Sequence, residues 1–304
     1  MTSAPSRLQV ALALAAVYLL WGSTYYAIVL ALPAYPPFLL TSVRMLIAGG
    51  LMLAVLVVRG PVRPTRAQWR NLVVLAILLT VISNALVNLA EVSVSSGLVS
   101  IGVAAMPIWA GVFSALRGQH PSRGEWAGLL LGFTGIVWLN AGTEISGTLV
   151  GALAVLVAPI SWAWGSIWSR GRDLPSPFVS AAWQMLLGSA GAAIVGLALG
   201  ERLAIPPPTA PTLALLYLVV AGSILGFTAY IWLLHHVRPA LATSYAYVNP
   251  PIAVLIGVAL GGESINAHGL GAMAVILLGV VLITLSKARA QPASALPPAA
   301  RPGA

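Results

Sequence analysis

No cysteine occurs in the sequence, so disulfides, thiolate catalysis and thiolate metal sites are all excluded. Charge is also scarce, because Asp, Glu, Lys and Arg together make up only 7% of the 304 residues. A soluble domain of this size needs far more charge to wet its surface. Hydrophobic residues reach 59%, and together with the lack of charge this predicts an all-α membrane protein.

The sequence also lacks the motifs of common membrane-associated enzymes and pumps. It contains no His-Glu-x-x-His zinc motif, no glycine loop for phosphate and no nucleophile beside a suitable base. The adjacent His235 and His236 end a predicted span, where a solvated helix end is a simpler interpretation than a metal site. No Asp or Glu lies in the middle of a predicted span, which removes a proton-exchanging carboxylate from the membrane centre. We therefore expect no enzyme activity, no metal, no cofactor and no ATP-driven transport by this chain.

Long apolar segments follow one another through nearly the whole chain. A window of about nineteen residues selects ten segments that can cross a hydrocarbon core of roughly 30 Å. These candidate spans are residues 9–32, 36–58, 69–90, 95–116, 124–142, 148–169, 178–199, 211–234, 240–261 and 267–286. The first follows Arg7 as a signal peptide would, but its apolar run is too long for one, so we expect it to be retained.

The positive charges alternate between the two sides of the predicted membrane domain. Of the 15 lysines and arginines, all except Arg44 and Arg202 fall in segments that are cytoplasmic if the N-terminus is cytoplasmic. This bias follows the positive-inside rule and, with ten spans, places both termini in the cytoplasm. The net charge of +9 therefore reports topology and contact with anionic headgroups, and it does not indicate nucleic-acid binding.

The two halves of the chain echo each other. Trp21-Gly22-Ser23 in the first span matches Trp164-Gly165-Ser166 in the sixth. We therefore expect two repeats, at residues 9–142 and 148–286, followed by a disordered cytoplasmic tail at residues 287–304. Because each repeat has an odd number of spans, the second must enter the membrane from the opposite side. This gives ten transmembrane helices in two inverted five-helix repeats around a central cavity.

Several longer stretches resemble a known family. They are WGSTY at residues 21–25, RMLIAGG at 44–50, Ala90-Glu91, ISWAWGS at 160–166 and PALATSYAYVNP at 239–250. Together they resemble the EamA-type branch of the drug/metabolite transporter superfamily, in particular its exporters of the bacterial inner membrane. The resemblance implies ten helices in two inverted halves around a central cavity, cytoplasmic termini, and efflux of amino acids, metabolites or drug-like molecules.

Three polar side chains share one face of the third span. Asn84, Asn88 and Glu91 fall at i, i+4 and i+7, which places them together on a helix. Polar groups inside a membrane point into the bundle or a wet cavity, so the asparagines are candidates for lining the permeation path. The alternative is that they tie helices together through hydrogen bonds to neighbouring backbone or hydroxyl groups.

One arginine lies inside a predicted span. Counted at 1.5 Å per residue from the start of its span, Arg44 lies about 10 Å below the outer surface, and an intramembrane arginine is costly unless paired or snorkelled. Glu91 is in the same leaflet, so we expect an Arg44–Glu91 ion pair that ties the second span to the third. Glu201 and Glu263 also lie on the outer side. The alternative is that Arg44 and Glu91 form an extracellular gate or a recognition point for a charged substrate.

Aromatic residues supply the remaining candidates. Tryptophans near helix ends, such as Trp69 and Trp126, suit the interfacial belt. Others lie deeper, where they would either flank a pocket for an aromatic or flat organic solute or simply pack. With the polar candidates, the predicted substrate-binding residues are Trp21, Thr24, Tyr25, Asn84, Asn88, Trp109, Trp164, Tyr230, Tyr245, Tyr247 and Asn249.

These features predict a multi-pass transporter in the lipid bilayer of the cell inner membrane that exports small organic molecules by alternating access. A cavity without a central charge favours neutral, zwitterionic or aromatic solutes over small ions. An importer or facilitator on the same scaffold is the main alternative, because the sequence carries no signal of direction. A membrane-embedded enzyme would need a polar constellation at the headgroup plane, where only scattered single residues occur.

Overall fold

The computed structural model describes residues 5–60, 62–93, 99, 102–139, 141, 148–261 and 267–286. Every regular element within these ranges is a helix. In this part of the chain, seven helices are long and apolar enough to cross a membrane, and a shorter apolar helix covers Gly102–Leu116. The prediction of an all-α membrane protein is therefore confirmed, whereas the count of ten spans stays a prediction. The predicted tail at residues 287–304 lies outside the described residues.

The first five elements follow the same order in each half of the chain. The first half contains α1 (Arg7–Ala31), α2 (Pro37–Val57), α3 (Arg66–Leu75), η1 (Ala76–Asn84), α4 (Ala85–Ser93), α6 (Met106–Leu116) and α7 (Arg123–Leu139). The second contains α8 (Leu149–Ser169), α9 (Pro177–Ala198), α10 (Thr209–Tyr217), η2 (Leu218–Gly226), α11 (Phe227–His236), α12 (Pro239–Ala242), α13 (Tyr245–Gly261) and α14 (Ala267–Leu285). The elements α3, η1 and α4 form one continuous rod, as do α10, η2 and α11.

Local sequence signals determine where several helices begin. Pro37 and Pro177 occupy the first positions of α2 and α9, where a missing backbone N–H costs nothing. At the start of α1, Ser6 and Gln9 form a capping box in which each side chain bonds the backbone of the other. The second helix of each half thus starts with the same residue type at the same place.

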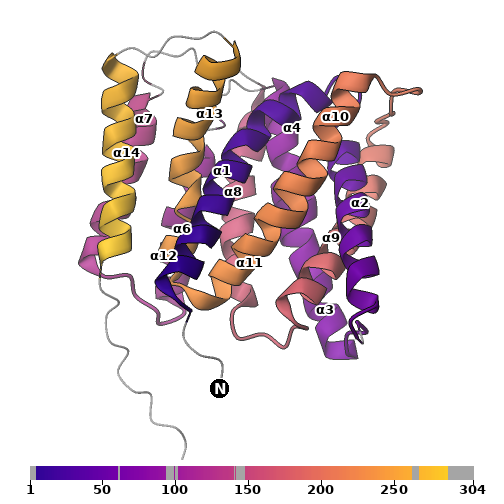
Figure 1. Cartoon of the computed structure of the whole chain (residues 1–304), viewed down its shortest axis with the longest axis horizontal. Coiled ribbons are helices and arrows are strands. Elements are labelled where there is room, and N and C mark those ends of the chain that lie inside the picture. The colour runs from indigo at the N-terminus through magenta and orange to yellow at the C-terminus, as the bar shows by residue number, and fades with distance from the viewer. Residues whose placement is uncertain are drawn as a thin grey trace, which may run out of the picture.

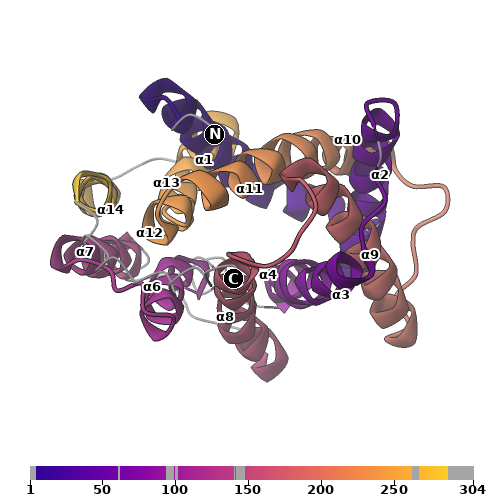
Figure 2. The ribbon, with the colours of Figure 1, turned by 90° about the horizontal axis from the view of Figure 1, so that it is seen from below.

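The helices form one bundle with a tightly packed pair at each end. In both views α7 packs against α14 at one end, and α2 packs against α9 at the other (Figure 1 and Figure 2). Between these pairs, α1 contacts η2, α10, α11 and α13, whereas α8 contacts η1, α4 and α6. The first helix of each half therefore packs into the opposite half. In Figure 1, α1 begins and α14 ends at the same edge of the bundle.

The outside of the bundle is apolar, and its inside carries polar groups. Leu8 and Ile194 are 68% and 70% exposed, whereas Arg44, Asn88 and Gln184 are almost completely buried. A soluble protein shows the opposite distribution. Lipid accepts the exposed leucines and isoleucines, while the buried polar side chains need partners inside the protein.

A π-helical segment interrupts each of the two long rods. η1 and η2 each contain nine residues and occupy matching places in the two halves. Such segments are rare and occur frequently at functional sites. Each accepts a hydrogen bond from the opposite half: Trp21 Nε1 donates to the oxygen of Gly222 at 2.8 Å, and Ser161 Oγ donates to the oxygen of Leu78 at 2.8 Å. The π-helical segments therefore lie where the halves meet.

Candidate functional site

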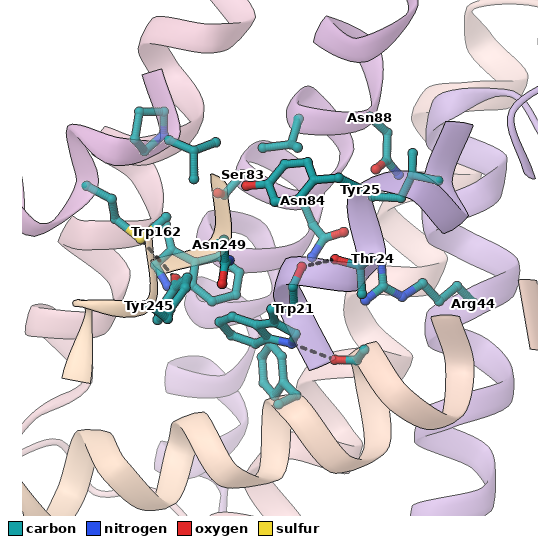
Figure 3. Close-up of a pocket in the computed structure, with 17 residues that line it drawn as sticks. Trp21, Thr24, Tyr25, Arg44, Ser83, Asn84, Asn88, Trp162, Tyr245 and Asn249 are labelled. Atoms are coloured by element: carbon teal, nitrogen blue, oxygen red, sulfur yellow. Dashed lines mark hydrogen bonds between the residues drawn. The ribbon is translucent and has the colours of Figure 1, made fainter. Parts of the chain in front are cut away.

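A cavity of about 90 Å³ lies between the two halves of the chain (Figure 3). The first half lines it with Trp21, Thr24, Tyr25, Ile28, Arg44, Ser83, Asn84, Val87, Asn88, Val103 and Met106. The second half adds Pro159, Trp162, Gly222, Phe227, Tyr245 and Asn249. Of the predicted substrate-binding residues, the cavity brings together Trp21, Thr24, Tyr25, Asn84, Asn88, Tyr245 and Asn249. Their role in binding stays a prediction.

Aromatic rings form one wall of the cavity, centred on Trp21 of α1. Its ring centroid lies 4.6 Å from that of Tyr245 and 5.6 Å from that of Trp162, both in edge-to-face contacts. Phe227 and Tyr230 of α11 lie 6.4 and 5.2 Å from Trp21. Rings at these separations attract one another through their quadrupoles. We call these five residues the aromatic wall; all except Tyr230 line the cavity, so they offer a surface on which a flat apolar group can stack.

Hydrogen bonds hold the polar atoms of the aromatic wall inside the protein. Trp162 Nε1 donates to the Tyr230 hydroxyl at 3.0 Å, and that hydroxyl also bonds Ser166 Oγ at 2.6 Å. The Tyr245 hydroxyl donates to the sulfur of Met106 at 3.0 Å. Because these donors and acceptors are satisfied by neighbouring side chains, the apolar ring faces are what the wall presents to the cavity.

Polar side chains gather on the other side of the cavity. Figure 3 shows Thr24, Asn88 and Arg44 on that side, across from Trp162 and Tyr245. The cavity is therefore amphipathic, and a solute with one apolar and one polar end can satisfy both walls at once.

Two asparagines of the cavity are only partly satisfied. Asn88 Nδ2 donates to the Thr41 hydroxyl at 2.9 Å and to the oxygen of Pro37 at 3.3 Å. Asn249 of α13 lines the same cavity from the second half of the chain. Within the described residues, the Oδ1 atoms of both asparagines are buried without a partner. Asn88 therefore ties α4 to α2, as one of the two interpretations predicted, and still keeps an acceptor for a donor in the cavity.

Arg44 is buried at the polar side of the cavity, with 5% of its surface exposed. Its Nε donates to Ser223 Oγ at 2.7 Å. The guanidinium lies directly against η2 at Gly222, where a Cβ atom would come within 2.5 Å of Nη2. The glycine thus makes room for the arginine, and the contact joins α2 of the first half to η2 of the second.

The predicted ion pair between Arg44 and Glu91 is not formed, and this prediction was wrong. The ion pair found in the described part of the chain joins Arg238 to Glu125, with 2.8 Å between Nη1 and Oε1. Both carboxylate oxygens of Glu91 are buried without a hydrogen-bond partner among these residues. Arg44 and Glu91 interact electrostatically over a longer distance. The physical reason is that Arg44 is directed at η2, where Ser223 accepts from its Nε, and not at α4.

Glu201, an alternative partner for Arg44, caps a helix. Its carboxylate accepts from the backbone N–H groups of Phe38 and Leu39 at 3.1 and 2.8 Å, at the start of α2. Negative charge is stabilising at this end of a helix. The other alternative, Glu263, lies outside the described residues. Within those residues, His, Asp and Glu side chains nowhere gather in the groups of three that could hold a metal ion.

Trp109 and Trp164 do not line the cavity. Both tryptophans instead contact Phe113, whose ring centroid lies 6.0 Å from that of Trp109 and 5.1 Å from that of Trp164. Trp164 is 38% exposed. Successive residues of an α-helix are rotated by about 100°, so Trp162 and Trp164 point in nearly opposite directions. The prediction for Trp164 depended on its match to Trp21 in the repeat, and that match selects the face of α8 that is turned away from the cavity.

Tyr230 and Tyr247 also lie off the cavity surface. Tyr230 is fully buried within the aromatic wall. Tyr247 is directed at α7, where its hydroxyl donates to the oxygen of Leu129 at 2.8 Å and its ring lies against Gly132. Tyr245 and Tyr247 are two residues apart and therefore lie on opposite faces of α13, so only Tyr245 faces the cavity.

Sequence reasoning missed several lining residues, of which Trp162 is the most prominent. Trp162, Phe227 and Met106 are apolar residues within apolar spans, where composition does not separate a cavity from lipid or core. One signal was available for Trp162. It lies four residues after Ala158 and three before Gly165, and these two small residues mark the packed face of α8.

Known proteins resemble the chain along nearly its whole length. The EamA-like transporter family matches residues 8–141 and, a second time, residues 149–285. "Uncharacterized inner membrane transporter YedA" of Escherichia coli (strain K12) is 40% identical over 276 residues, which cover 90% of each protein. "Uncharacterized transporter YvbV" of Bacillus subtilis (strain 168) is 28% identical over 94% of each protein. A protein crystal structure with 24% identity superposes with a TM-score of 0.78 over 92% of this chain and 98% of the other, which shows a shared fold.

Proposed function

Because this chain belongs to the EamA-like transporter family and is a multi-pass transporter of the inner membrane, we propose that it exports small organic solutes by alternating access. The proposed solutes are amino acids and aromatic or drug-like molecules. One observation carries this proposal: both halves of the chain build one amphipathic cavity, with stacked rings on one side and polar groups on the other. Such a site suits an organic solute better than a small ion.

The proposed architecture has ten transmembrane helices in two inverted repeats, at residues 9–142 and 148–286, with both termini in the cytoplasm. The repeated order of elements supports it. So do the corresponding contacts that α1 and α8 make in the opposite halves. The start of α1 and the end of α14 at one edge of the bundle agree with termini on one side (Figure 1). The loop arginines then assign that side to the cytoplasm.

The proposed binding site places an apolar ring of the solute against the aromatic wall, beside which Asn249 lies, and the polar end of the solute near Asn88 on the other side (Figure 3). The unpartnered Oδ1 atoms of these asparagines supply acceptors for the donors of a solute, because a buried acceptor without a partner is costly. The cavity of about 90 Å³ has room for a few water molecules. A solute of amino-acid size therefore requires the walls to move apart, as alternating access provides.

The contacts between the halves suggest which bonds must change during transport. Trp21 and Ser161 reach across to single carbonyl oxygens of η2 and η1. Arg238, which precedes α12, pairs with Glu125 at the start of α7, so an ion pair links the halves at the proposed cytoplasmic edge. Opening of that edge would separate this pair, while the α2–α9 and α7–α14 pairs can move as units.

Flux measurements in vesicles of known orientation test the proposal. A comparison of metabolites in cells with and without the protein selects solutes, and radiolabelled L-phenylalanine is the first one to measure. Export predicts accumulation in inside-out vesicles and little in right-side-out vesicles. Equal equilibration in both would indicate a facilitator, and accumulation only in right-side-out vesicles an importer. Ion conduction without movement of any organic solute would overturn the proposal.

A further inference from the structure

Arg44 carries a buried positive charge that no carboxylate of the described residues contacts. Among the described residues, Arg44 donates a hydrogen bond from Nε to Ser223 Oγ. The ion pair found among these residues joins Arg238 to Glu125 and does not involve Arg44. Glu91 balances the charge only over a longer distance. A guanidinium has five N–H donors in a rigid fork, so the groups on Nη1 and Nη2 are left for another partner. Arg44 also lines the cavity, which is where such a partner can arrive.

We propose that Arg44 forms an anion subsite of the cavity and that this subsite binds a carboxylate of the transported solute. The inference rests on the proposed function, because it assumes that the solute occupies this cavity. A buried cation is costly unless it is paired. A carboxylate fits the fork of a guanidinium through two parallel hydrogen bonds, which no neutral oxygen matches in strength. None of the described residues supplies a counter-ion in contact with Arg44, and the carboxylate of the solute takes that place.

The surroundings of Arg44 hold the fork in one orientation. Ser223 accepts from Nε on one side, and Gly222 lets Nη2 rest against the backbone of η2. A Cβ at position 222 would also come within 2.9 Å of the Thr24 methyl carbon, so Thr24 closes the same corner. A guanidinium fixed in this way loses little freedom when it binds, which favours a planar two-oxygen group.

The position of Arg44 relative to the aromatic wall defines the class of solute. Figure 3 shows Arg44 on the opposite side of the cavity from Trp162 and Tyr245. A carboxylate at Arg44 therefore directs the rest of the solute toward the rings. The solute class that fits is an aromatic carboxylate. An ammonium beside that carboxylate would donate to Asn88, on the same side of the cavity as Arg44, and add to the affinity without replacing the anion.

Three matched compounds test the anion subsite: 3-phenylpropanoate, L-phenylalanine and 2-phenylethylamine, which share a ring and differ in charge. Equilibrium binding to the purified full-length protein should rank both carboxylates above the amine. In Arg44→Gln, affinity for the carboxylates should fall roughly ten- to hundredfold, as expected for a hydrogen-bonded charge, while affinity for the amine stays or rises. If Arg44 served only to stabilise the fold, the ratio of carboxylate affinity to amine affinity would not change in this variant.

Further variants guard against a folding defect. Arg44→Lys keeps the charge but not the fork, so it should bind carboxylates with intermediate affinity. Gly222→Ala keeps Arg44 but displaces its guanidinium, so it should weaken carboxylate binding as well. Gln184→Leu is the control: Gln184 precedes Met185-Leu186 as Arg44 precedes Met45-Leu46, and it is buried away from the cavity, so it should leave all three affinities unchanged.

The outcomes separate this inference from the proposed function. Binding of all three compounds with equal affinity, or carboxylate affinity that is unchanged in Arg44→Gln, would overturn the anion subsite and leave an aromatic solute site standing. Binding of the amine in preference to both carboxylates would also overturn it and would point to Glu91 as the recognition group. Failure of all three compounds to bind would overturn the inference together with the aromatic solute class.

Discussion

The indole Nε1 of Trp21 donates a hydrogen bond to the backbone oxygen of Gly222 at 2.8 Å and so joins the first helix of one half to the π-helical segment of the other. The same carbonyl belongs to the glycine that makes room for Arg44. The aromatic and the polar sides of the cavity therefore meet on one turn of η2. A movement of η2 relative to α1 would alter both sides together, which is what a binding site in an alternating-access transporter requires.

Two substitutions at Trp21 separate its ring from its hydrogen bond. Trp21→Phe keeps an aromatic surface and loses one hydrogen bond, so it should cost about 1 kcal/mol of stability and retain measurable flux. Trp21→Ala removes the centre of the aromatic wall and should abolish solute binding. Thermal unfolding of the purified proteins and solute flux in vesicles measure the two effects. If the Phe variant were as inactive as the Ala variant, the hydrogen bond and not the ring would be the functional feature.

Trp162 and Trp164 provide a matched pair, because they are the same residue type two positions apart on opposite faces of α8. Trp162→Ala should reduce solute affinity by roughly tenfold through loss of ring contacts. Trp164→Ala should leave affinity unchanged, since this ring lies outside the cavity and contacts Phe113. Binding to the two purified variants at equal protein amounts checks the prediction. Equal losses in both variants would show that the cavity does not face Trp162.

The difference between these two tryptophans shows what sequence alone could supply. Polar residues at helical spacing mark an inward face of a membrane helix, and Asn84 and Asn88 do line the cavity. The same rule has no force for tryptophan, since both the lipid and the core accept an apolar ring. Only the structure shows which face of α8 is turned toward the cavity, and therefore that Trp162 and not Trp164 lines it.

The environment of Arg44 shows a second limit on what can be predicted from the sequence. The cost of an unpaired charge in a membrane predicts that Arg44 interacts with a polar group, and Ser223 does accept from it. Which group it contacts depends on how α2 packs against η2, a long-range relationship between the two halves. The sequence shows Glu91 and Glu201 equally near the outer surface, but Glu201 instead caps α2.

The cap that Glu201 forms on α2 leads to a prediction about stability. Glu201→Gln removes the charge that interacts with the backbone N–H groups of Phe38 and Leu39, so it should lower the free energy of unfolding by about 1 kcal/mol. Flux per folded molecule should not change, because Glu201 does not line the cavity. Arg202→Gln, at the neighbouring exposed position, is the control. Denaturant unfolding in detergent measures the difference, and an identical midpoint for wild type and Glu201→Gln would contradict the cap.

The absence of cysteine makes the chain suited to a direct test of alternating access, because each introduced thiol is the only one. Thr24→Cys places a thiol in the cavity, and a membrane-impermeant thiol reagent should modify it from either side of the membrane. Ser189→Cys, buried beside Ser42 where α9 packs on α2, should remain unmodified. Bound solute should slow modification of Thr24→Cys, since solute and reagent compete for one space.

Two exposed positions calibrate the sidedness of this experiment. Under the proposed topology, Arg59→Cys should react only from the cytoplasmic side and Arg202→Cys only from the outer side. If these two controls react from opposite sides but Thr24→Cys reacts from one side alone, even during solute exchange, the cavity never opens to the other side. A single-sided cavity can bind a solute but cannot carry it across the membrane, so that result would refute alternating access through the site around Trp21.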